Sequence, residues 1–597
     1  MSVREFSAPP TYTVPATGNL TDDIVANSRR FGGKVVVSRR QGGEWRDVTA
    51  RQFLVEVQAT AKGLLAAGVA AGDRVALISK TRYEWTLLDY AIWYAGAITV
   101  PVYETSSTEQ IAWILTDSVA VLAVAETADH VAKIDVSRDE LTELRDVVCL
   151  DDGGIDRLVA AGLHISDDEL EARRAAVTPE SVATLIYTSG TTGRPKGCTL
   201  THGNFMFELG VATQVLDELF DSEAASTLLF LPLAHVFARI IQVGAVKHRV
   251  RLGHSADITN LLDDLGSFHP TFILAVPRVF EKVFNTASQR AVADGRGKIF
   301  DAAIKTAITY SQARDHSGPG PLLKARHALF DRLVYAKLSL ALGGKAQYAV
   351  SGGAPLGERL AHFFRGVGLP VLEGYGLTET TAALTVNLPA TQRIGTVGRP
   401  LPGTSVRVAA DGELLFQGGQ VFRGYWHDEV ATADAIDDDG WFRTGDLGEI
   451  DDDGFVRITG RKKEILVTAG GKNVAPTVLE DCVRAHSLVS QCMVVGDGRP
   501  FVGALVTIDD EALAAWGEAN GKSGGLTSLL RDPDLTAAVQ RAVDDANAAV
   551  SRAEAIRKFA ILPVDWTEET GELTPTLKLK RALVMRRFHA EVESLYV

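Results

Sequence analysis

The chain has 597 residues, of which 46% are hydrophobic and 23% charged, and its formal net charge at pH 7 is −14. These values are typical of a globular protein with several folding units, and the negative charge argues against general affinity for nucleic acid. Four cysteines without a CxxC pair predict neither a disulfide framework nor a zinc site, and they suit a reducing cytoplasm. The longest apolar run, 90–100, is too short to cross a bilayer as a helix. Peripheral contact with a membrane is left open.

Helical and strand-like patterns alternate through the first part of the chain. Val55, Ala59, Leu64 and Leu65 share one stripe of a predicted helix. A strand at 74–78, a helix at 84–95 and a strand at 98–102 then form a β-α-β unit, which is typical of a mainly parallel sheet. Further strands are predicted at 272–276, 347–350 and 371–372. The pattern predicts a large layered α/β body.

The pattern changes after about residue 400. Short strands are predicted at 406–408, 413–416, 447–450 and 455–459, and Asp453-Gly454 indicates a hairpin between the last two. Beyond Gly460 the chain becomes a smaller α+β unit with a helix near 534–550. We therefore predict two domains, residues 1–462 and 463–597.

The most informative segment is residues 187–197, YTSGTTGRPKG, which follows the apolar run 183–186. Its glycines let the backbone approach a ligand, its hydroxyls add donors, and Lys196 supplies a positive charge. It is not a Walker A loop, because Pro195 and Gly197 stand where that motif needs glycine and a magnesium-binding hydroxyl. A simple surface turn is the alternative. We interpret the segment as a loop that wraps an oligophosphate.

This loop closely resembles the phosphate loop of the adenylate-forming superfamily, which includes acyl-CoA synthetases, luciferase and nonribosomal-peptide adenylation domains. Further matching segments follow in the expected order at 231–235, 351–356, 373–380, 442–446, 460–464 and 573–581. Residues 276–282 (VPRVFEK), the helical region 280–345 and the ending TPTLKLKR are most similar to bacterial long-chain fatty acid–CoA ligases.

The resemblance implies a fold and a reaction. The fold is α/β, with a large multi-layer N-terminal domain of mixed, mainly parallel sheets plus a distorted β-barrel, followed by a small mobile α+β lid domain. The reaction joins a long-chain fatty acid to ATP with Mg²⁺, which gives an acyl-adenylate and pyrophosphate, and then transfers the acyl group to coenzyme A. A fatty acyl-AMP ligase that delivers to a carrier protein and an inactive nucleotide-binding scaffold are the alternatives. A homodimer is left open.

The resemblance also implies roles for individual residues. Lys578, Lys196, His235 and Glu379 are implied for catalysis, with Thr188 and Glu379 as the magnesium ligands; His235 is expected beside the acyl carboxylate and is not assigned as a general base. The residues implied in nucleotide and CoA binding are Thr188, Ser189, Gly190, Thr191, Thr192, Gly193, Lys196, Gly352, Gly353, Glu373, Gly374, Tyr375, Gly376, Thr378, Asp446, Arg461, Gly470 and Gly471.

Within that set, Tyr375 and Gly352-Gly353 are implied to form the adenine slot, and Asp446 with Arg461 to hold the ribose. Gly470-Gly471 are expected at the pantetheine tunnel.

The C-terminal lysine departs from the family pattern. Leu577 stands where a glycine commonly precedes that lysine, and Lys580 lies two residues further on. Lys578 fits better because Arg581 follows it by three positions, but the register between Lys578 and Lys580 is left open. The resemblance places the hinge between the two half-reactions at Lys463.

The acyl pocket is less well defined by the sequence, and a core position is an equal alternative for most of its candidates. The helix after the phosphate loop and the segment after His235 supply the candidate lining residues Phe205, Phe207, Leu209, Val211, Val215, Leu216, Phe237 and Ile240. Arg239 is the remaining question: if it faces the tunnel, it either responds to the charged CoA or blocks the entrance.

Overall fold

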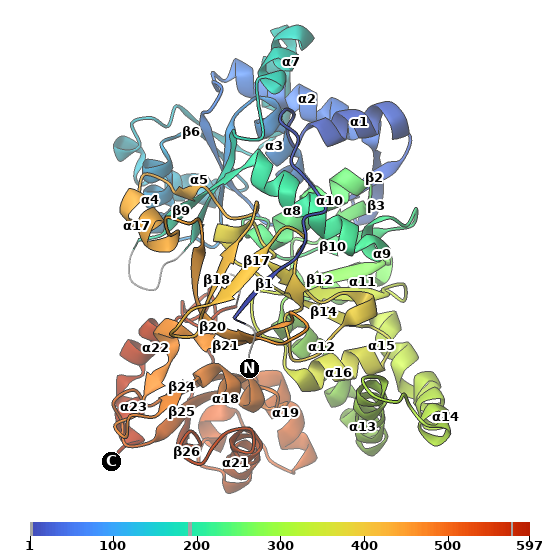
Figure 1. Cartoon of the computed structure of the whole chain (residues 1–597), viewed down its shortest axis with the longest axis vertical. Coiled ribbons are helices and arrows are strands. Elements are labelled where there is room, and N and C mark those ends of the chain that lie inside the picture. The colour runs from blue at the N-terminus through green and yellow to red at the C-terminus, as the bar shows by residue number, and fades with distance from the viewer. Residues whose placement is uncertain (1–3, 189–193, 575–576) are drawn as a thin grey trace.

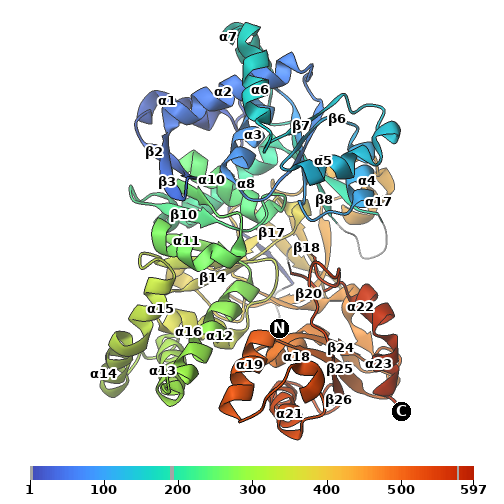
Figure 2. The same ribbon diagram turned by 180° about the vertical axis from the view of Figure 1, so that it is seen from behind.

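The computed structural model describes residues 4–188, 194–574 and 577–597. A large body contains three sheets, and a smaller C-terminal domain lies beneath it (Figure 1). In the reverse view the C-terminal domain again lies beside the lower edge of the body (Figure 2).

A seven-stranded sheet contains the predicted β-α-β unit. Its order is β19-β9-β8-β5-β4-β6-β7; β8, β5, β4, β6 and β7 run parallel to one another, whereas β9 pairs antiparallel with both β8 and β19. The strands are β4 (Arg74–Ile78), β5 (Ile98–Val102), β6 (Ala120–Ala125), β7 (Asp146–Cys149), β8 (Val182–Thr188), β9 (Lys196–Thr201) and β19 (Gly424–Tyr425). The helix predicted at 84–95 is α3 (Tyr83–Tyr94).

The first predicted helix is present as α2 (Ala50–Ala66), but the residues of the predicted stripe do not lie on one side, because Leu64 and Leu65 are buried and Val55 is exposed. Val55 is 58% exposed, whereas Phe53, Val57 and Leu64 are buried. These three residues lie on one side of the helix at intervals close to whole turns. A single β-branched residue was therefore a poor guide to the core face.

A nine-stranded sheet forms the second layer, in the order β16-β15-β14-β13-β12-β10-β11-β2-β3. Its strands are β2 (Val35–Gln41), β3 (Glu44–Thr49), β10 (Ser226–Leu229), β11 (Arg251–His254), β12 (Phe272–Ala275), β13 (Tyr348–Ser351), β14 (Val371–Tyr375), β15 (Thr385–Val386) and β16 (Arg399–Pro400). Helices α3, α8 (His202–Val215) and α10 (Val236–His248) are buried over most of their surface and share one core with both sheets. The predicted layered body is confirmed.

The four strands predicted after residue 400 belong to a five-stranded antiparallel sheet, ordered β1-β17-β18-β20-β21. They are β17 (Ser405–Val408), β18 (Glu413–Gln417), β20 (Phe442–Ile450) and β21 (Val456–Arg461), and the fifth strand is β1 (Glu5–Ser7), which was not predicted. Gly454 turns the predicted hairpin with φ +83°, a conformation that favours glycine. In the described residues this sheet takes the place of the expected distorted barrel and is open between β1 and β21.

The C-terminal domain has its own core, as a separate folding unit requires. Its three-stranded sheet contains β24 (Val489–Val495), β25 (Val502–Ile508) and β26 (Ile556–Ile561), and a small hairpin contains β22 (Leu466–Val467) and β23 (Asn473–Val474). Its helices include α18 (Pro476–Arg484), α19 (Asp510–Ala519), α21 (Pro533–Asn547), α22 (Arg581–Arg587) and α23 (His589–Ser594). The helix predicted near 534–550 is α21.

A helical segment connects β12 to β13 and projects from the lower edge of the body (Figures 1 and 2). It contains α12 (Pro277–Ala293), α13 (Gly297–Arg314), α14 (Pro321–Phe330), a π-turn (Asp331–Tyr335) and α15 (Ala336–Ala341); α16 (Glu358–Gly366) packs against α13. Among the described residues, we find no helix with the length and apolar character needed to span a membrane.

Candidate active site

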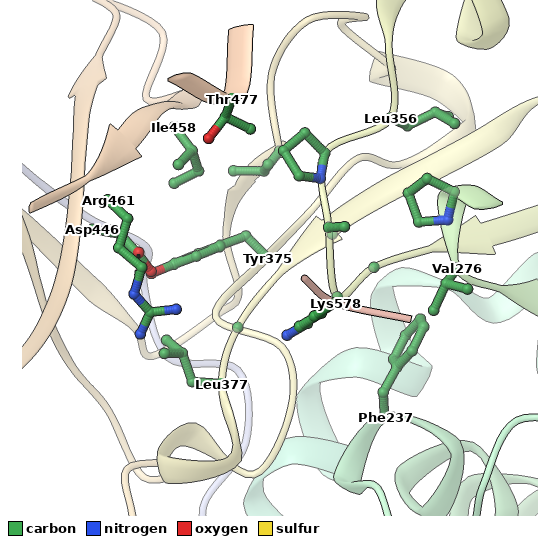
Figure 3. A pocket seen from close by; sticks show the side chains of 18 of the residues that line it. Phe237, Val276, Leu356, Tyr375, Leu377, Asp446, Ile458, Arg461, Thr477 and Lys578 are labelled. Carbon is green, nitrogen blue, oxygen red and sulfur yellow. Dashed lines mark hydrogen bonds and ion pairs between the residues drawn. The ribbon is translucent and has the colours of Figure 1, made fainter. Parts of the chain in front are cut away.

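A cavity of about 1930 Å³ lies where the large body meets the C-terminal domain. Of the predicted site residues that the structure describes, all except Gly470 and Gly471 line it. They come from segments nearly 400 residues apart in the sequence. Figure 3 shows four of them, Tyr375, Asp446, Arg461 and Lys578, around one space. Ser189, Gly190, Thr191, Thr192 and Gly193 lie outside the described residues.

The phosphate-loop candidate connects two strands of an antiparallel hairpin. Thr188 ends β8 directly opposite Lys196, which begins β9. The Lys196 ammonium lies 3.1 Å from an Asp428 carboxylate oxygen and 5.3 Å from the centre of the Tyr425 ring. The hairpin therefore places one hydroxyl and one cation at the wall of the cavity.

Glu379 approaches the same hairpin from a short 3-10 turn, Thr378–Thr380. Its carboxylate accepts a hydrogen bond of 2.9 Å from the Tyr425 phenol, and its carbonyl accepts one of 2.7 Å from the Phe422 N–H. Burial and then the Glu379 carboxylate raise the pKa of Cys198, whose sulfur lies 3.9 Å from the Thr188 hydroxyl. Thr188 and Glu379 thus lie close to one buried thiol.

A hydroxyl and a carboxylate fit a hard cation such as Mg²⁺, which keeps water and substrate phosphate oxygens as its other ligands. No cluster of three or more His, Cys, Asp or Glu side chains suited to a metal occurs in the described part of the chain. The residues present therefore fit a shared site, in which a nucleotide would supply further ligands.

Asp446 and Arg461 face each other across β20 and β21. The Arg461 Nε lies 3.6 Å from Asp446 Oδ1, and the Tyr375 phenol donates a hydrogen bond of 2.6 Å to Asp446 Oδ2. Burial raises the pKa of Asp446, whereas Arg461 and the hydrogen bond from Tyr375 oppose that rise. The Tyr375 ring also contacts Phe416, with 5.9 Å between ring centres. These contacts fix the carboxylate in position (Figure 3).

The chain is tightly packed around Gly352 and around Gly376. A Cβ atom on Gly352 would lie 3.1 Å from Phe237, and one on Gly376 would lie 1.4 Å from the Ala382 carbonyl oxygen. A side chain at Gly376 is therefore impossible without moving the backbone. Gly374 and Thr378 line the cavity beside them, and Gly353 has φ +83°.

Glu373 lies beneath these segments and anchors one of them. Its carboxylate accepts a 2.9 Å hydrogen bond from the Leu356 N–H, at the end of the Gly352-Gly353 turn. Burial raises the pKa of Glu373 to about 8, and the charges of Asp481 and Glu358 add to the rise. Glu373 thus holds the turn from a buried position, a more specific arrangement than the sequence indicated.

Lys578 extends from the C-terminal domain into the cavity (Figure 3). Lys578 is accessible to solvent, and it lines the cavity together with residues of both domains. Burial and then Arg461 lower its pKa, while Asp446, Glu379 and Glu464 oppose this. The side chain therefore lies among the residues predicted to bind nucleotide and metal.

The residue before it, Leu577, has φ +60°. This left-handed conformation favours glycine, which explains why the related motif commonly carries glycine at that position. Lys580, the alternative lysine, lines the same cavity; it occupies the cap position of α22, and its N–H donates to the Glu572 carbonyl.

His235 caps the N-terminus of α10. Its Nδ1 accepts a 3.2 Å hydrogen bond from the Phe237 N–H, so a proton on the neutral ring resides at Nε2. Burial and the Lys578 cation lower its pKa to about 3. The ring is therefore neutral near pH 7 and has a structural function in addition to any contact with substrate.

Lys463 lies in a short 3-10 turn, Lys462–Glu464, at the entry to the C-terminal domain, and it also lines the cavity. Gly470 and Gly471 lie in the exposed turn between β22 and β23, with φ +74° at Gly471, and they do not line the cavity. The described arrangement thus brings Lys578, and not the Gly470-Gly471 turn, to the site.

The acyl-pocket candidates divide into two groups. Leu209, Leu216, Phe237 and Ile240 line the cavity, as do Ala212, Thr213, Phe220 and Ile241, which the sequence did not single out. The remaining candidates Phe205, Phe207, Val211 and Val215 are not among its lining residues. They belong to or pack against the core.

Glu208 also lines this apolar part of the cavity, and sequence reasoning missed it. It is 1% exposed, and burial raises its pKa. One carboxyl oxygen accepts a 3.1 Å hydrogen bond from the Ala383 N–H. The sequence signal that could have identified Glu208 is its position as the acidic residue within the apolar run FMFELGVA (205–212).

Arg239 neither faces the tunnel nor blocks it. It is fully buried and forms an ion pair with the equally buried Asp89, and its Nη1 donates a 2.5 Å hydrogen bond to the Thr184 hydroxyl. Trp85 and Trp93 lie within cation–π distance of it, at 5.4 and 5.1 Å. Both conditional roles in CoA binding are therefore wrong, because the charge is neutralised in the core between α3 and α10.

Comparisons with known proteins agree with this arrangement. A family model described as AMP-binding enzyme matches residues 24–426, and one described as AMP-binding enzyme C-terminal domain matches residues 463–597. Long-chain-fatty-acid–CoA ligase FadD15 of Mycobacterium tuberculosis is 52% identical over the full length of both chains. Long-chain-fatty-acid–CoA ligase ACSBG1 of Homo sapiens is 29% identical, over 95% of this chain and 84% of its own.

Two solved structures share the fold. The A domain of carboxylic acid reductase from Segniliparus rugosus, in complex with AMP and a co-purified carboxylic acid, has a TM-score of 0.74 and 22% identity, and the match covers 97% of this chain and 94% of that one. O-succinylbenzoate coenzyme A synthetase from Bacillus subtilis, in complex with ATP and magnesium, has a TM-score of 0.67 and 19% identity, with 94% and 98% covered.

The layered body, the small C-terminal domain and the cavity between them define the adenylate-forming enzyme fold. The chain belongs to the AMP-binding enzyme family, in the group that contains the fatty-acid–CoA ligases.

Proposed function

We propose that the chain is an AMP-forming long-chain fatty acid–CoA ligase, which acts in the cytoplasm. In the first step, a carboxylate oxygen of the fatty acid bonds to the α-phosphorus of ATP, and the bond from that phosphorus to the pyrophosphate oxygen breaks. In the second step, the CoA sulfur bonds to the acyl carbon, the bond to AMP breaks, and the thiol proton is released. The observation that carries this proposal is Lys578, placed in one cavity with Lys196, Glu379 and Asp446.

Adenylation brings two anions together, so the site must neutralise their charge. Lys196 on the hairpin and Lys578 on the C-terminal domain supply cations from the two domains. Thr188 and Glu379 would hold Mg²⁺, which supplies charge stabilisation at the phosphates when bound.

The nucleoside would bind beside Tyr375. Asp446, held by Arg461 and the Tyr375 phenol, is oriented to accept hydrogen bonds from the ribose hydroxyls. The Gly352-Gly353 turn leaves space for the flat adenine ring, and the anchor at Glu373 keeps that turn in place.

The acyl chain would extend between α8 and α10. Leu209, Leu216 and Ile240 form an apolar wall there, and each CH₂ group buried against such a wall contributes about 0.8 kcal/mol. This favours long chains over short ones.

His235 is proposed to position the acyl carboxylate and later the acyl-adenylate. A ring whose pKa is about 3 is a poor base near pH 7, and AMP is already a good leaving group. Correct positioning of the thiol is therefore the main requirement of the second step.

We assign residues 1–462 to the adenylation domain and 463–597 to the mobile lid. Rotation at Lys463 would withdraw Lys578 after adenylation and bring Gly470-Gly471 to the pantetheine chain, since one space cannot hold both the lysine and the thiol.

The test is to incubate the purified protein with ATP, CoA and fatty acids of increasing length, with Mg²⁺ or with EDTA. We expect AMP, pyrophosphate and acyl-CoA in equal amounts, with longer chains preferred and EDTA abolishing turnover. Acyl-adenylate without acyl-CoA would favour the carrier-protein ligase. Formation of ADP, or no turnover of nucleotide at all, would overturn the proposal.

A further inference from the structure

The outer face of the helical run α14–α15 carries a row of exposed leucines. Leu322, Leu329, Leu333 and Leu340 expose 84, 56, 49 and 69% of their surface. Their spacing of seven, four and seven residues places them on one side of a helix. Large apolar side chains gathered in this way on a surface mark an interaction site.

The opposite face of the same run is firmly packed. Phe330, Tyr335 and Leu338 are buried. The Tyr335 phenol donates a 2.7 Å hydrogen bond to the Ala303 carbonyl, and the His327 ring stacks on Tyr310 with 3.9 Å between centres. Phe330, Tyr335 and Leu338 therefore form the side of α14–α15 that faces the core, and the four exposed leucines form a second apolar face.

The segment that carries this face is rich in basic residues. Residues 321–345 contain one acidic residue, Asp331, in a chain whose net charge is −14. They contain five basic residues, all exposed: Lys324, Arg326, Arg332, Lys337 and Lys345. An apolar stripe bordered by basic side chains on a helix suits the interface of an anionic bilayer.

We propose that this docking face, formed by the four leucines together with Arg326 and Lys337, which lie three or four positions from them, binds the surface of a membrane that contains anionic lipids. The leucines enter the boundary between headgroups and acyl chains, and the lysines and arginines meet lipid phosphates. A second copy of the chain is a poorer occupant, because pairing two such faces would bring like charges together.

The position of the face is compatible with catalysis. In both views α14 lies at an outer corner of the body, on the side away from α22 and α23 (Figures 1 and 2). A membrane bound there leaves those helices of the lid uncovered. If the proposed function holds, docking also places the enzyme where long-chain fatty acids partition; the docking itself does not depend on that function.

The test is co-sedimentation of the full-length protein with vesicles of phosphatidylcholine, with or without phosphatidylglycerol. We expect binding to the anionic vesicles that weakens in high salt. The double variant Leu329→Glu/Leu333→Glu should lower the partition coefficient by at least about tenfold, because it places charge where the apolar contact forms. Arg326→Glu/Lys337→Glu should remove the preference for phosphatidylglycerol.

Leu163→Glu is the matched control, since Leu163 is 81% exposed but lies outside this face. It should bind as the unchanged protein does. Acyl-adenylate formation without vesicles checks that each variant is folded, and it separates loss of docking from loss of the proposed reaction. Binding that is absent, or equal in the Leu329/Leu333 variant, would overturn the proposal. So would a dimer that this variant dissolves while vesicle binding persists.

Discussion

At the scale of single residues, the site depends on a few side chains whose environment differs strongly from water. Lys578 crosses from one domain into the other and lies among Arg461, Asp446 and Glu379. Leu577 adopts the left-handed conformation that makes this approach possible. Lys580, two residues further along the same segment, lines the same cavity, so mutation must separate the two lysines.

Lys578→Ala should lower the rate of acyl-adenylate formation by about 10²–10³-fold, as expected when a preorganised charge at a reacting centre is lost. Thioester formation from supplied acyl-adenylate and CoA should change little. Pyrophosphate exchange measures the first step and acyl-CoA release the second. Lys580→Ala is the matched control; if it caused the larger loss of adenylation, the assignment to Lys578 would be wrong.

Glu373 predicts a pH dependence of stability. Its pKa is raised from 4.5 to about 8 in the folded protein, so between these values the unfolded chain binds fewer protons than the native one. This carboxyl group therefore makes stability fall as pH rises through that range. Glu373→Gln, whose amide oxygen can still accept from Leu356, should flatten the decline. Urea unfolding at pH 5 and pH 8 measures it, and an unchanged slope in the variant would show that another group causes the decline.

At the scale of elements, two helices of the large body hold the lid in its present orientation. Arg278 on α12 donates a 3.1 Å hydrogen bond to the Ser490 hydroxyl, and Arg359 on α16 donates one of 2.8 Å to the Ala485 carbonyl. Both acceptors belong to the C-terminal domain. The same orientation places Lys578 in the cavity, which in the proposed function is the arrangement for adenylation, and these contacts would favour it.

Replacing both arginines, Arg278→Ala/Arg359→Ala, should slow adenylate formation by about tenfold, because hydrogen bonds from charged donors that hold this orientation are removed. Thioester formation from supplied acyl-adenylate should be unchanged or faster. Arg290→Ala, an exposed arginine on the same helix, is the control. A uniform loss of both half-reactions would indicate general damage instead of a shift between two orientations.

The sequence predicted the positions of individual helices and strands better than it predicted long-range contacts. Alternation and helical periodicity predicted β4, α3, β5 and α21 nearly to the residue, because local spacing encodes which side is buried. The stripe predicted on α2 was wrong at Val55, which is exposed and lies about two and a half turns from the buried Leu64, on the opposite side of the helix. The fate of Arg239 was not predictable, because its partner Asp89 lies 150 residues away and only the folded core brings them together.

At the scale of the whole molecule, the two domains meet at one cavity and are joined through Lys463. The substitution Lys463→Pro should leave adenylation nearly intact and slow thioester formation, since proline restricts the backbone rotation that the second step needs. This is the opposite of the effect expected for Lys578→Ala. Separate assays of the two half-reactions compare them, and equal loss in both would exclude Lys463 as the hinge.

One continuous stretch of chain connects the two ends of the reaction. Lys196 begins β9, Thr201 caps the helix that follows it directly, and that helix, α8, carries Leu209 along the acyl wall. The proposed phosphate-binding and acyl-binding residues therefore lie on one strand–helix unit, β9-α8. In the proposed function, any redesign of this helix for shorter or branched acids should therefore change the KM for ATP as well.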